Sequence, residues 1–485
     1  MSKEEPRSFA NLVELPDFIS PLTIKELRQG TRAHSAFSFC FGTLLLGTVI
    51  LFLVQWRDQS ESSGSTVLGL LWILGFCVNV LLIPTLALQS VTREIESGTH
   101  ELLLLTGASG WNLSVGKIAS PLALAIVNLI LILPFATFAY FQRGVSLEDI
   151  FFIELELLLL STFAITGAIF LGCIGLHRTT RWMARIGAGI FGLFFAGYYL
   201  GRGFNLMRFG EETSPWLNIA PTLILTVSCV PVFLAAAQGR LGRTGSFDTP
   251  QLRLVAVLVQ QVLLGVLIWS SQYHLVSLSP RSESLVLVTS CLIVAHFVLA
   301  ALCFCCGPLE PAKRSIAVFP ARVSRALLLG PGVHRGMLLC LAMAGETLFV
   351  LMLLGNSRPT GSVHLSFGIL LSIFFLVGNP LWAAILGLLG GRRVAPVAGI
   401  LFGLLVNWIA ILLAAVSPQA DPSPIGMLSP FTNDLDQGGD LSWPGFAALF
   451  VVFAALLRLI RTERETRERS RLRQELARPS TEAAS

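Results

Sequence analysis

The stretch Arg93–Lys117, REIESGTHELLLLTGASGWNLSVGK, lies between two long apolar runs and determines how the rest of the chain is interpreted. It begins with charged residues, passes through Gly98 and Thr99, and then becomes rich in leucine. Because glycine readily ends a helix, Gly98-Thr99 is expected to close one helix and open another. Leu102–Leu105 can then pack a single turn against an apolar groove. The stretch predicts a solvent-exposed loop that carries one short helix between two membrane spans.

The composition is that of a membrane protein. Of the 485 residues, 54% are hydrophobic and 13% are charged, whereas a soluble domain carries about 25% charged residues. A bilayer core of about 30 Å needs roughly 20 apolar residues per helix. Nothing in the chain alternates like a barrel strand, so the spans are expected to be helices. The predicted fold class is an all-α polytopic membrane protein with about twelve spans: 36–55, 67–90, 113–139, 150–176, 186–201, 217–238, 254–272, 284–306, 336–355, 364–389, 397–416 and 444–460.

The basic residues predict how these spans are oriented. If the N-terminus is cytosolic, the inside segments hold 28 of the 34 lysines and arginines, and the outside segments hold 6. This asymmetry is the one that the positive-inside rule describes. Both termini and the loop 91–112 are therefore expected in the cytosol, with 56–66 and 417–443 outside. The net charge of +5 then lies on the cytosolic membrane face and indicates no nucleic-acid partner.

The loop resembles a motif of type-2 ABC (ATP-binding-cassette) exporter permeases. The family pattern is E-x-E-x-G-T-x-E-L-L-L-x-T, followed by G-K at the start of the next span. The matching residues here are Glu94, Glu96, Gly98, Thr99, Glu101, Leu102, Leu103, Leu104, Thr106, Gly116 and Lys117. The resemblance implies that this segment is the coupling helix, which docks on an ATPase subunit.

A second resemblance precedes the first span. The run Ser20–Gln29 is similar to the N-P-x-x-x-K-E-L-R opening of the same permeases, through Pro21, Lys25, Glu26, Leu27 and Arg28. Apolar residues are interspersed with basic ones in this run, so it is expected to form an amphipathic helix in the headgroup layer. In the family this is the elbow helix.

The domain organisation follows from the spans and the resemblance. Residues 1–35 are the cytosolic N-terminus with the elbow helix, and 36–240 form a six-span permease module that contains the coupling loop 91–112. Residues 241–253 are a linker, 254–460 a second six-span half, and 461–485 a charged cytosolic tail. The second half is either a degenerate copy of the module or an appended set of spans.

The resemblance implies the function of a permease subunit in the bacterial cytoplasmic (inner) membrane. Such a subunit couples ATP hydrolysis in a separate cassette subunit to export of a substrate. No G-x-x-x-x-G-K-[ST] occurs in the chain, so ATP and Mg²⁺ are expected on the partner, with no cofactor and no catalytic residue here. Membrane lipid and a second copy of the chain are further expected partners. The sequence does not identify the substrate.

A polar layer near mid-membrane supports an alternative function. Near the centres of their spans lie Asn79, Asn128, His296, Glu346 and Asn407. Buried polar groups in spans either line an ion path or join helices by hydrogen bonds. The first possibility would make the chain an ion- or proton-coupled secondary transporter, and the second is structural. His296 and Glu346, on consecutive antiparallel spans, are expected to lie close enough to interact.

Two further interpretations, a membrane enzyme and a metal-binding cysteine cluster, find little support in the sequence. A polytopic membrane enzyme would need a catalytic or metal-binding constellation, and the sequence shows none at usable spacing. The cysteines at 303, 305 and 306 lie together without histidine at ligand spacing nearby, so they are expected to be small buried hydrophobes rather than metal ligands.

Overall fold

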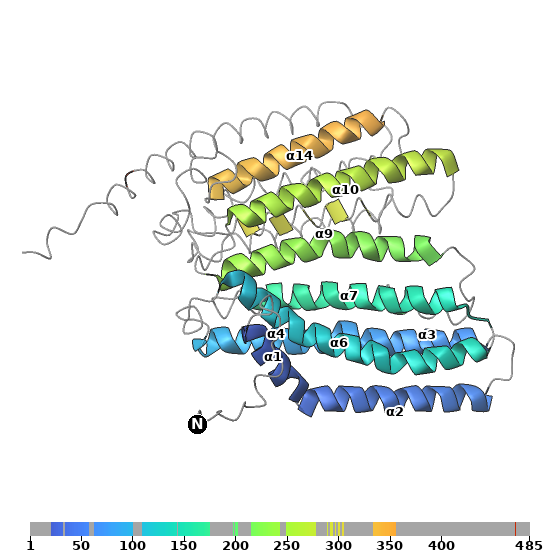
Figure 1. Ribbon diagram of the computed structural model, residues 1–485. Helices are drawn as coiled ribbons and strands as arrows, with labels where there is room; N and C mark the ends of the chain where they lie inside the picture. Colours follow the sequence, from blue (N-terminus) through green and yellow to red (C-terminus); the bar gives the residue numbers. More distant parts are fainter. Residues whose placement is uncertain are drawn as a thin grey trace, which may run out of the picture. The chain divides into compact units, whose positions relative to one another are not determined.

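The computed structural model is helical throughout its regular elements (Figure 1). It describes residues 21–32, 34–57, 63–99, 109–142, 144–174, 197, 199–201, 215–242, 249–277 and 333–355, together with 289, 292, 293, 296, 299, 300, 303, 304 and 471.

The helices follow the predicted spans closely and extend a few residues beyond most of their ends. Their bounds are α1 (Pro21–Arg32), α2 (His34–Arg57), α3 (Ser63–Phe76), η2 (Cys77–Leu82), α4 (Ile83–Glu96), α6 (Gly110–Phe141), α7 (Leu147–Ile174), α9 (Pro215–Leu241), α10 (Pro250–Ser277) and α14 (Val333–Gly355). The elements α3, η2 and α4 are consecutive and together form the predicted second span.

Six helical stretches of the described residues are long and apolar enough to cross a membrane. They are Phe37–Trp56, Gly64–Glu96, Gly110–Phe141, Leu147–Cys173, Ile219–Leu241 and Pro250–Gln272. The all-helical class is thereby confirmed for the described residues, with six candidate membrane-spanning helices. The predicted spans 364–389, 397–416 and 444–460 lie outside the described residues, and 186–201 and 284–306 are described only at scattered positions. The count of twelve stays a prediction.

Local sequence explains where the helices begin. Pro21, Pro215 and Pro250 each occupy the first position of a helix, where a missing N–H costs no hydrogen bond. At the start of α7, the Ser146 N–H donates to Asp149 Oδ2 at 2.8 Å and the Asp149 N–H donates to Ser146 Oγ at 3.1 Å. This reciprocal pair is a capping box, and it satisfies two N–H groups that the helix itself leaves without partners.

The second span is not a uniform α-helix. Residues Cys77–Leu82 form the π-helical segment η2, in which the Ile83 N–H bonds to the Val78 carbonyl, five residues earlier. Pro84 follows at once and can donate no backbone hydrogen bond, while the Thr85 hydroxyl donates to the Leu82 carbonyl at 2.7 Å. A proline crowds the carbonyl four residues before it, and a wide turn is one way a helix accommodates this crowding. The helical span predicted over 67–90 therefore contains a π-helical segment that the sequence did not predict.

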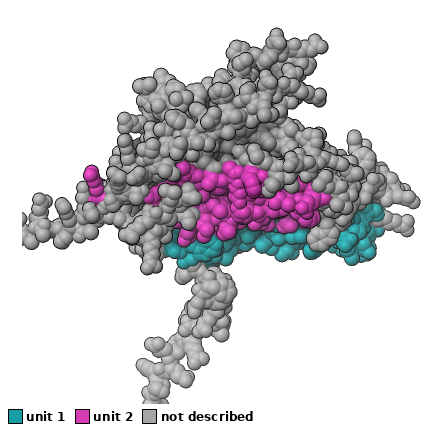
Figure 2. All heavy atoms as spheres, turned by 90° about the horizontal axis from the view of Figure 1, so that it is seen from above, with its two compact units in different colours: residues 1–172, 198–210 teal, residues 173–197, 211–485 magenta. Residues whose placement is uncertain are grey.

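Two compact units divide the chain (Figure 2). Unit 1 comprises Met1–Gly172 with Tyr198–Gly210, and unit 2 comprises Cys173–Gly197 with Glu211–Ser485. In unit 1, α1, α2 and α3 pack against α6, and in unit 2, α10 packs against α9 and α14. The helical break predicted within 241–253 lies between the end of α9 at Leu241 and the start of α10 at Pro250. The modular division itself stays a prediction.

The core of unit 1 is centred on α3. Trp72 and Phe76 stack on each other and both stack on Tyr199, with ring centroids 5.3 to 6.3 Å apart. A Cβ added at Gly75 would lie 2.8 Å from Leu157 Cδ1 and 3.2 Å from Ile132 Cδ1, so α6 and α7 approach α3 closely here. The glycine is what permits this approach, and the register of α3 against its neighbours is therefore fixed.

Helix α2 has the opposite character. Its large apolar side chains are exposed, among them Phe37 at 74%, Phe52 at 64% and Trp56 at 82%. In water such a face would be costly, whereas in lipid tails it costs nothing. The exposure of α2 agrees with a helix that faces the bilayer.

Candidate functional site

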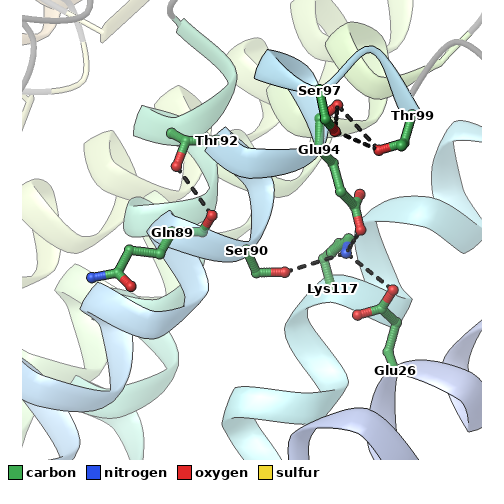
Figure 3. Close-up of polar contacts among 8 residues, drawn as sticks. All are labelled: Glu26, Gln89, Ser90, Thr92, Glu94, Ser97, Thr99 and Lys117. Atoms are coloured by element: carbon green, nitrogen blue, oxygen red, sulfur yellow. Dashed lines mark hydrogen bonds and ion pairs between the residues drawn. The ribbon is translucent and has the colours of Figure 1, made fainter.

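A buried lysine joins three helices of unit 1 (Figure 3). Lys117, on the second turn of α6, donates to Glu26 Oε1 on α1 at 3.0 Å and to Ser90 Oγ on α4 at 3.3 Å. It also forms an ion pair with Glu94, near the end of α4. These four residues, Glu26, Ser90, Glu94 and Lys117, are called the Lys117 cluster below.

Burial makes the Lys117 cluster energetically important. The side chains of Lys117 and Glu26 are 5% and 8% exposed, and that of Glu94 is 25% exposed. A charge taken out of water is tolerated only if it is paired, and removing one partner of a buried pair costs about 3–5 kcal/mol. The cluster holds one ammonium and two carboxylates. Its helices therefore cannot separate there without exposing a charge to an apolar environment.

Helix α1 packs against α6 and buries polar side chains. Thr23 and Glu26 are buried, while Lys25 and Arg28 are exposed. The amphipathic helix predicted over Ser20–Gln29 is present from Pro21, and Ser20 lies outside the described residues. The face that α1 buries carries an acid and a hydroxyl rather than the expected apolar side chains alone. The Glu26 carboxylate packs inward because Lys117 needs a counter-charge.

The end of α4 is shaped by a left-handed glycine. Gly98 has φ 72°, a conformation that glycine adopts without strain, and it follows the last residue of α4 by two positions. The Ser97 and Thr99 hydroxyls lie 2.9 Å apart, and both donate to the Glu94 carbonyl, at 3.3 and 3.4 Å. Thr99 is again helical. The predicted break at Gly98-Thr99 is confirmed.

The loop ends at a capped helix start. The Asn112 N–H donates to Ser109 Oγ at 3.2 Å, and α6 begins at Gly110. Between these two ends, Glu101, Leu102, Leu103, Leu104 and Thr106 lie outside the described residues. The helical ends nevertheless shorten the loop from the predicted 91–112 to 97–109. Of the other motif residues, Glu96 is exposed and Gly116 is buried.

The motif residues that meet were predicted individually but not as a group. Glu26 was assigned to the elbow helix, Glu94 to the coupling loop and Lys117 to the start of a span, and Ser90 was not singled out. A lysine inside an apolar run is the feature that could have revealed the cluster. Such a lysine needs a buried acid, and the acids nearest the same membrane face are few.

The mid-membrane layer of unit 1 is internally hydrogen-bonded. Asn128 Nδ2 donates to Asn79 Oδ1 at 3.0 Å, and Thr43 Oγ1 lies 2.6 Å from Asn128 Oδ1. All three side chains are at most 1% exposed, so the triad joins α2, η2 and α6. Asn79 Nδ2 is buried without a hydrogen-bond partner. Asn79 and Asn128 were predicted in one layer, and Thr43 was missed because a threonine in a span usually bonds its own helix.

The polar residues of unit 2 bond differently from the expectation. His296 Nε2 lies 3.0 Å from the Ala256 carbonyl, and Glu346 Oε1 accepts from Gln261 Nε2 at 2.7 Å. Each residue thus bonds to α10 rather than to the other. The expected contact between His296 and Glu346 was wrong. Gln260 also joins Thr347 at 2.5 Å, and Asn407 lies outside the described residues.

No group of three or more histidine, cysteine or acidic side chains that could hold a metal ion occurs among the described residues. Of the three clustered cysteines, Cys303 is buried in unit 2, and Cys305 and Cys306 lie outside the described residues. The comparisons with protein-family models, curated proteins and solved structures find no match to this chain.

Proposed function

We propose that this chain is the membrane-spanning permease subunit of a type-2 ABC exporter. A separate cassette subunit would bind ATP and Mg²⁺, dock on the loop 97–109, and drive export of a substrate across the bacterial cytoplasmic membrane. The observation that carries the proposal is the Lys117 cluster, which ties both helical ends of that loop to α1. This arrangement suits a loop that transmits force, because both of its ends are held.

The cluster explains how a push on the loop would reach the membrane. Glu94 lies three residues before Ser97, and Lys117 lies eight residues after Ser109, so a displacement of the loop acts on both α4 and α6. Because the ion pairs are buried, α1, α4 and α6 move together for as long as the pair between Lys117 and Glu94 holds. The elbow helix then carries the movement to α2, which follows it directly.

The mid-membrane triad supports the permease over the secondary transporter. A proton path needs titratable groups, whereas Thr43, Asn79 and Asn128 carry none and are hydrogen-bonded to one another. Hydrogen bonds of this kind hold transmembrane helices together at about 0.6 kcal/mol each. We assign the triad a structural role in the resting state.

Site-specific photocrosslinking tests the docking surface directly. A photoreactive amino acid replaces Ser97 or Thr99, both exposed, in cells that express the full chain. A matched control carries it at Trp56, which is exposed at the far end of α2. We expect adducts at 97 and 99 with a protein that contains Walker motifs, identified by mass spectrometry, and none at 56. The proposal fails if neither loop position captures an ATPase.

A further inference from the structure

The π-helical segment η2 sets the register of everything that follows it in the second span. A π-turn holds one residue more than an α-turn, so each residue of α4 occupies the place that its predecessor would have in an uninterrupted α-helix. If the wide turn tightened, α4 would rotate by about 100° and advance by about 1.5 Å relative to α3. Residues 77–82 therefore allow two registers of α4 relative to α3, one with the π-turn and one without it.

Helix α3 cannot take up this rotation. Its ring stack with Tyr199 and the close approach of α6 and α7 at Gly75 fix its orientation. The change must therefore fall on α4, whose C-terminal end carries part of the Lys117 cluster.

The neighbouring sequence defines what the second register would contain. Glu94 and Ser90 face Lys117 now, and a shift by one residue would bring Arg93 and Gln89 to the same places. Arg93 is exposed in the present register. The shift would replace attraction between Lys117 and a carboxylate by repulsion between two cations. The ion pair between Lys117 and Glu94 therefore stabilises the present register.

The packing of α4 permits the second register. A Cβ added at Gly172 of α7 would lie 3.1 Å from Val91 Cβ and 3.5 Å from Leu88 Cδ1, so these side chains now fill the contact. After the shift, Ser90 and Ala87 would occupy it, and both are smaller. No steric barrier therefore opposes the rotation at this contact. The buried Asn79 Nδ2, which has no hydrogen-bond partner within η2, is a cost that the present register carries.

We propose that η2 is a register switch, in which tightening of the π-turn rotates α4 by one residue and exchanges Glu94 for Arg93 opposite Lys117. The switch links the Thr43–Asn128–Asn79 triad at mid-membrane to the loop that follows α4. Its trigger rests on the proposed function, since a push from a docked ATPase on Ser97–Thr99 would act along α4. The two registers themselves do not depend on an ATPase, because both are conformations of this chain.

The first experiment asks whether the second register exists, with no ATPase present. The double variant R93E/E94R places a carboxylate opposite Lys117 only after the shift, and a guanidinium there before it. We expect a cryo-electron microscopy structure in lipid nanodiscs to show a continuous α-helix over 63–96, with the new carboxylate beside Lys117. Persistence of the wide turn at 77–82 would overturn the proposal.

The second experiment asks whether η2 holds a removable extra residue. Deletion of Leu81, which is 36% exposed, leaves a straight α-helix that keeps Glu94 opposite Lys117. Deletion of Leu70 in α3 is the matched control, because it misaligns the span instead. We expect the melting temperature to stay within about 3 °C of wild type for the first deletion and to fall by more than about 6 °C for the second. Equal losses would overturn the proposal.

The third experiment separates the switch from the proposed function. The Leu81 deletion should bind the ATPase as wild type does, yet lose at least about tenfold in its stimulation of ATP hydrolysis, because α4 can no longer change register. Full stimulation would overturn the switch as a coupling device. If the wild-type chain binds no ATPase, the proposed function fails, and the first two experiments alone decide whether the registers exist.

Discussion

Lys117 is the residue on which the site depends most. Its ammonium is the single positive charge between two carboxylates, and its side chain is 5% exposed. Substitution of Glu26, Ser90 or Glu94 removes a single contact to Lys117. Loss of Lys117 leaves Glu26 and Glu94 without their shared counter-charge in a largely buried site.

The variant Lys117→Met is therefore expected to lower the free energy of unfolding by about 3–5 kcal/mol. The matched control Lys25→Met, on the exposed face of α1, should change it by less than about 0.5 kcal/mol. Chemical denaturation in mild detergent measures both. The triple variant K117M/E26Q/E94Q should recover most of the loss, because no uncompensated charge remains. A loss in the triple variant equal to that in Lys117→Met would contradict the electrostatic account.

Substitutions at Gly98 test whether the backbone conformation of the loop matters for stability and for ATPase binding. No atom lies within 4 Å of a Cβ built there, so the cost of Gly98→Ala comes from φ 72° alone and is about 1–2 kcal/mol. Gly98→Asn should cost less, because asparagine tolerates the left-handed region, and Gly98→Pro should cost most. We expect ATPase co-purification to fall in the order Gly, Asn, Ala, Pro, and to be lost in Glu101→Lys, which reverses a charge in the motif. Equal co-purification in all variants would remove the loop from the docking surface.

At the scale of the element, the second span carries the most information that the sequence did not reveal. Its apolar length predicted a helix, and the observed helix extends four residues before and six residues after the predicted bounds. The π-turn was not predicted because hydropathy records neither the backbone geometry before Pro84 nor the packing of α3. The Lys117 cluster likewise joins residues 91 and 23 positions apart, which only tertiary packing brings together.

Double-mutant cycles test the helix contacts at mid-membrane. In the cycle of Asn79→Leu with Asn128→Leu, we expect a coupling energy of about 0.6 kcal/mol, and below about 1.7 kcal/mol, because the two amides bond directly. In the cycle of His296→Leu with Glu346→Leu, the losses should add within about 0.5 kcal/mol, because each residue bonds to α10 instead. Thermal unfolding in one detergent measures all the variants. A coupling in the second cycle as large as in the first would restore the direct pair.

At the scale of the whole molecule, composition indicated a membrane protein, and the apolar runs along the sequence located the described helices. Apolar runs of this length have few other uses, so the prediction needed no tertiary detail. The number of spans in the second half rests on the same hydropathy argument. There the residues 364–389, 397–416 and 444–460 await a direct test of topology.

Cysteine accessibility provides that test. In a cysteine-depleted background, single cysteines at 97, 60 and 430 are treated with a membrane-impermeant maleimide on intact cells. The distribution of lysine and arginine predicts labelling at 60 and 430 and protection at 97, which should react only after permeabilisation. Labelling of 97 from outside would invert the topology, and protection of 430 with labelling of 60 would change the span count of the second half.

The Lys117 cluster also has a consequence for the order in which the protein is synthesised and inserted into the membrane. Glu26 leaves the ribosome 91 residues before Lys117, which is about 5–20 s at normal rates of synthesis, and Glu94 precedes it by 23 residues. Both carboxylates have thus already been synthesised when the lysine-bearing helix leaves the ribosome. Helix α1, made before the described spans, would then supply a counter-ion for the insertion of α6.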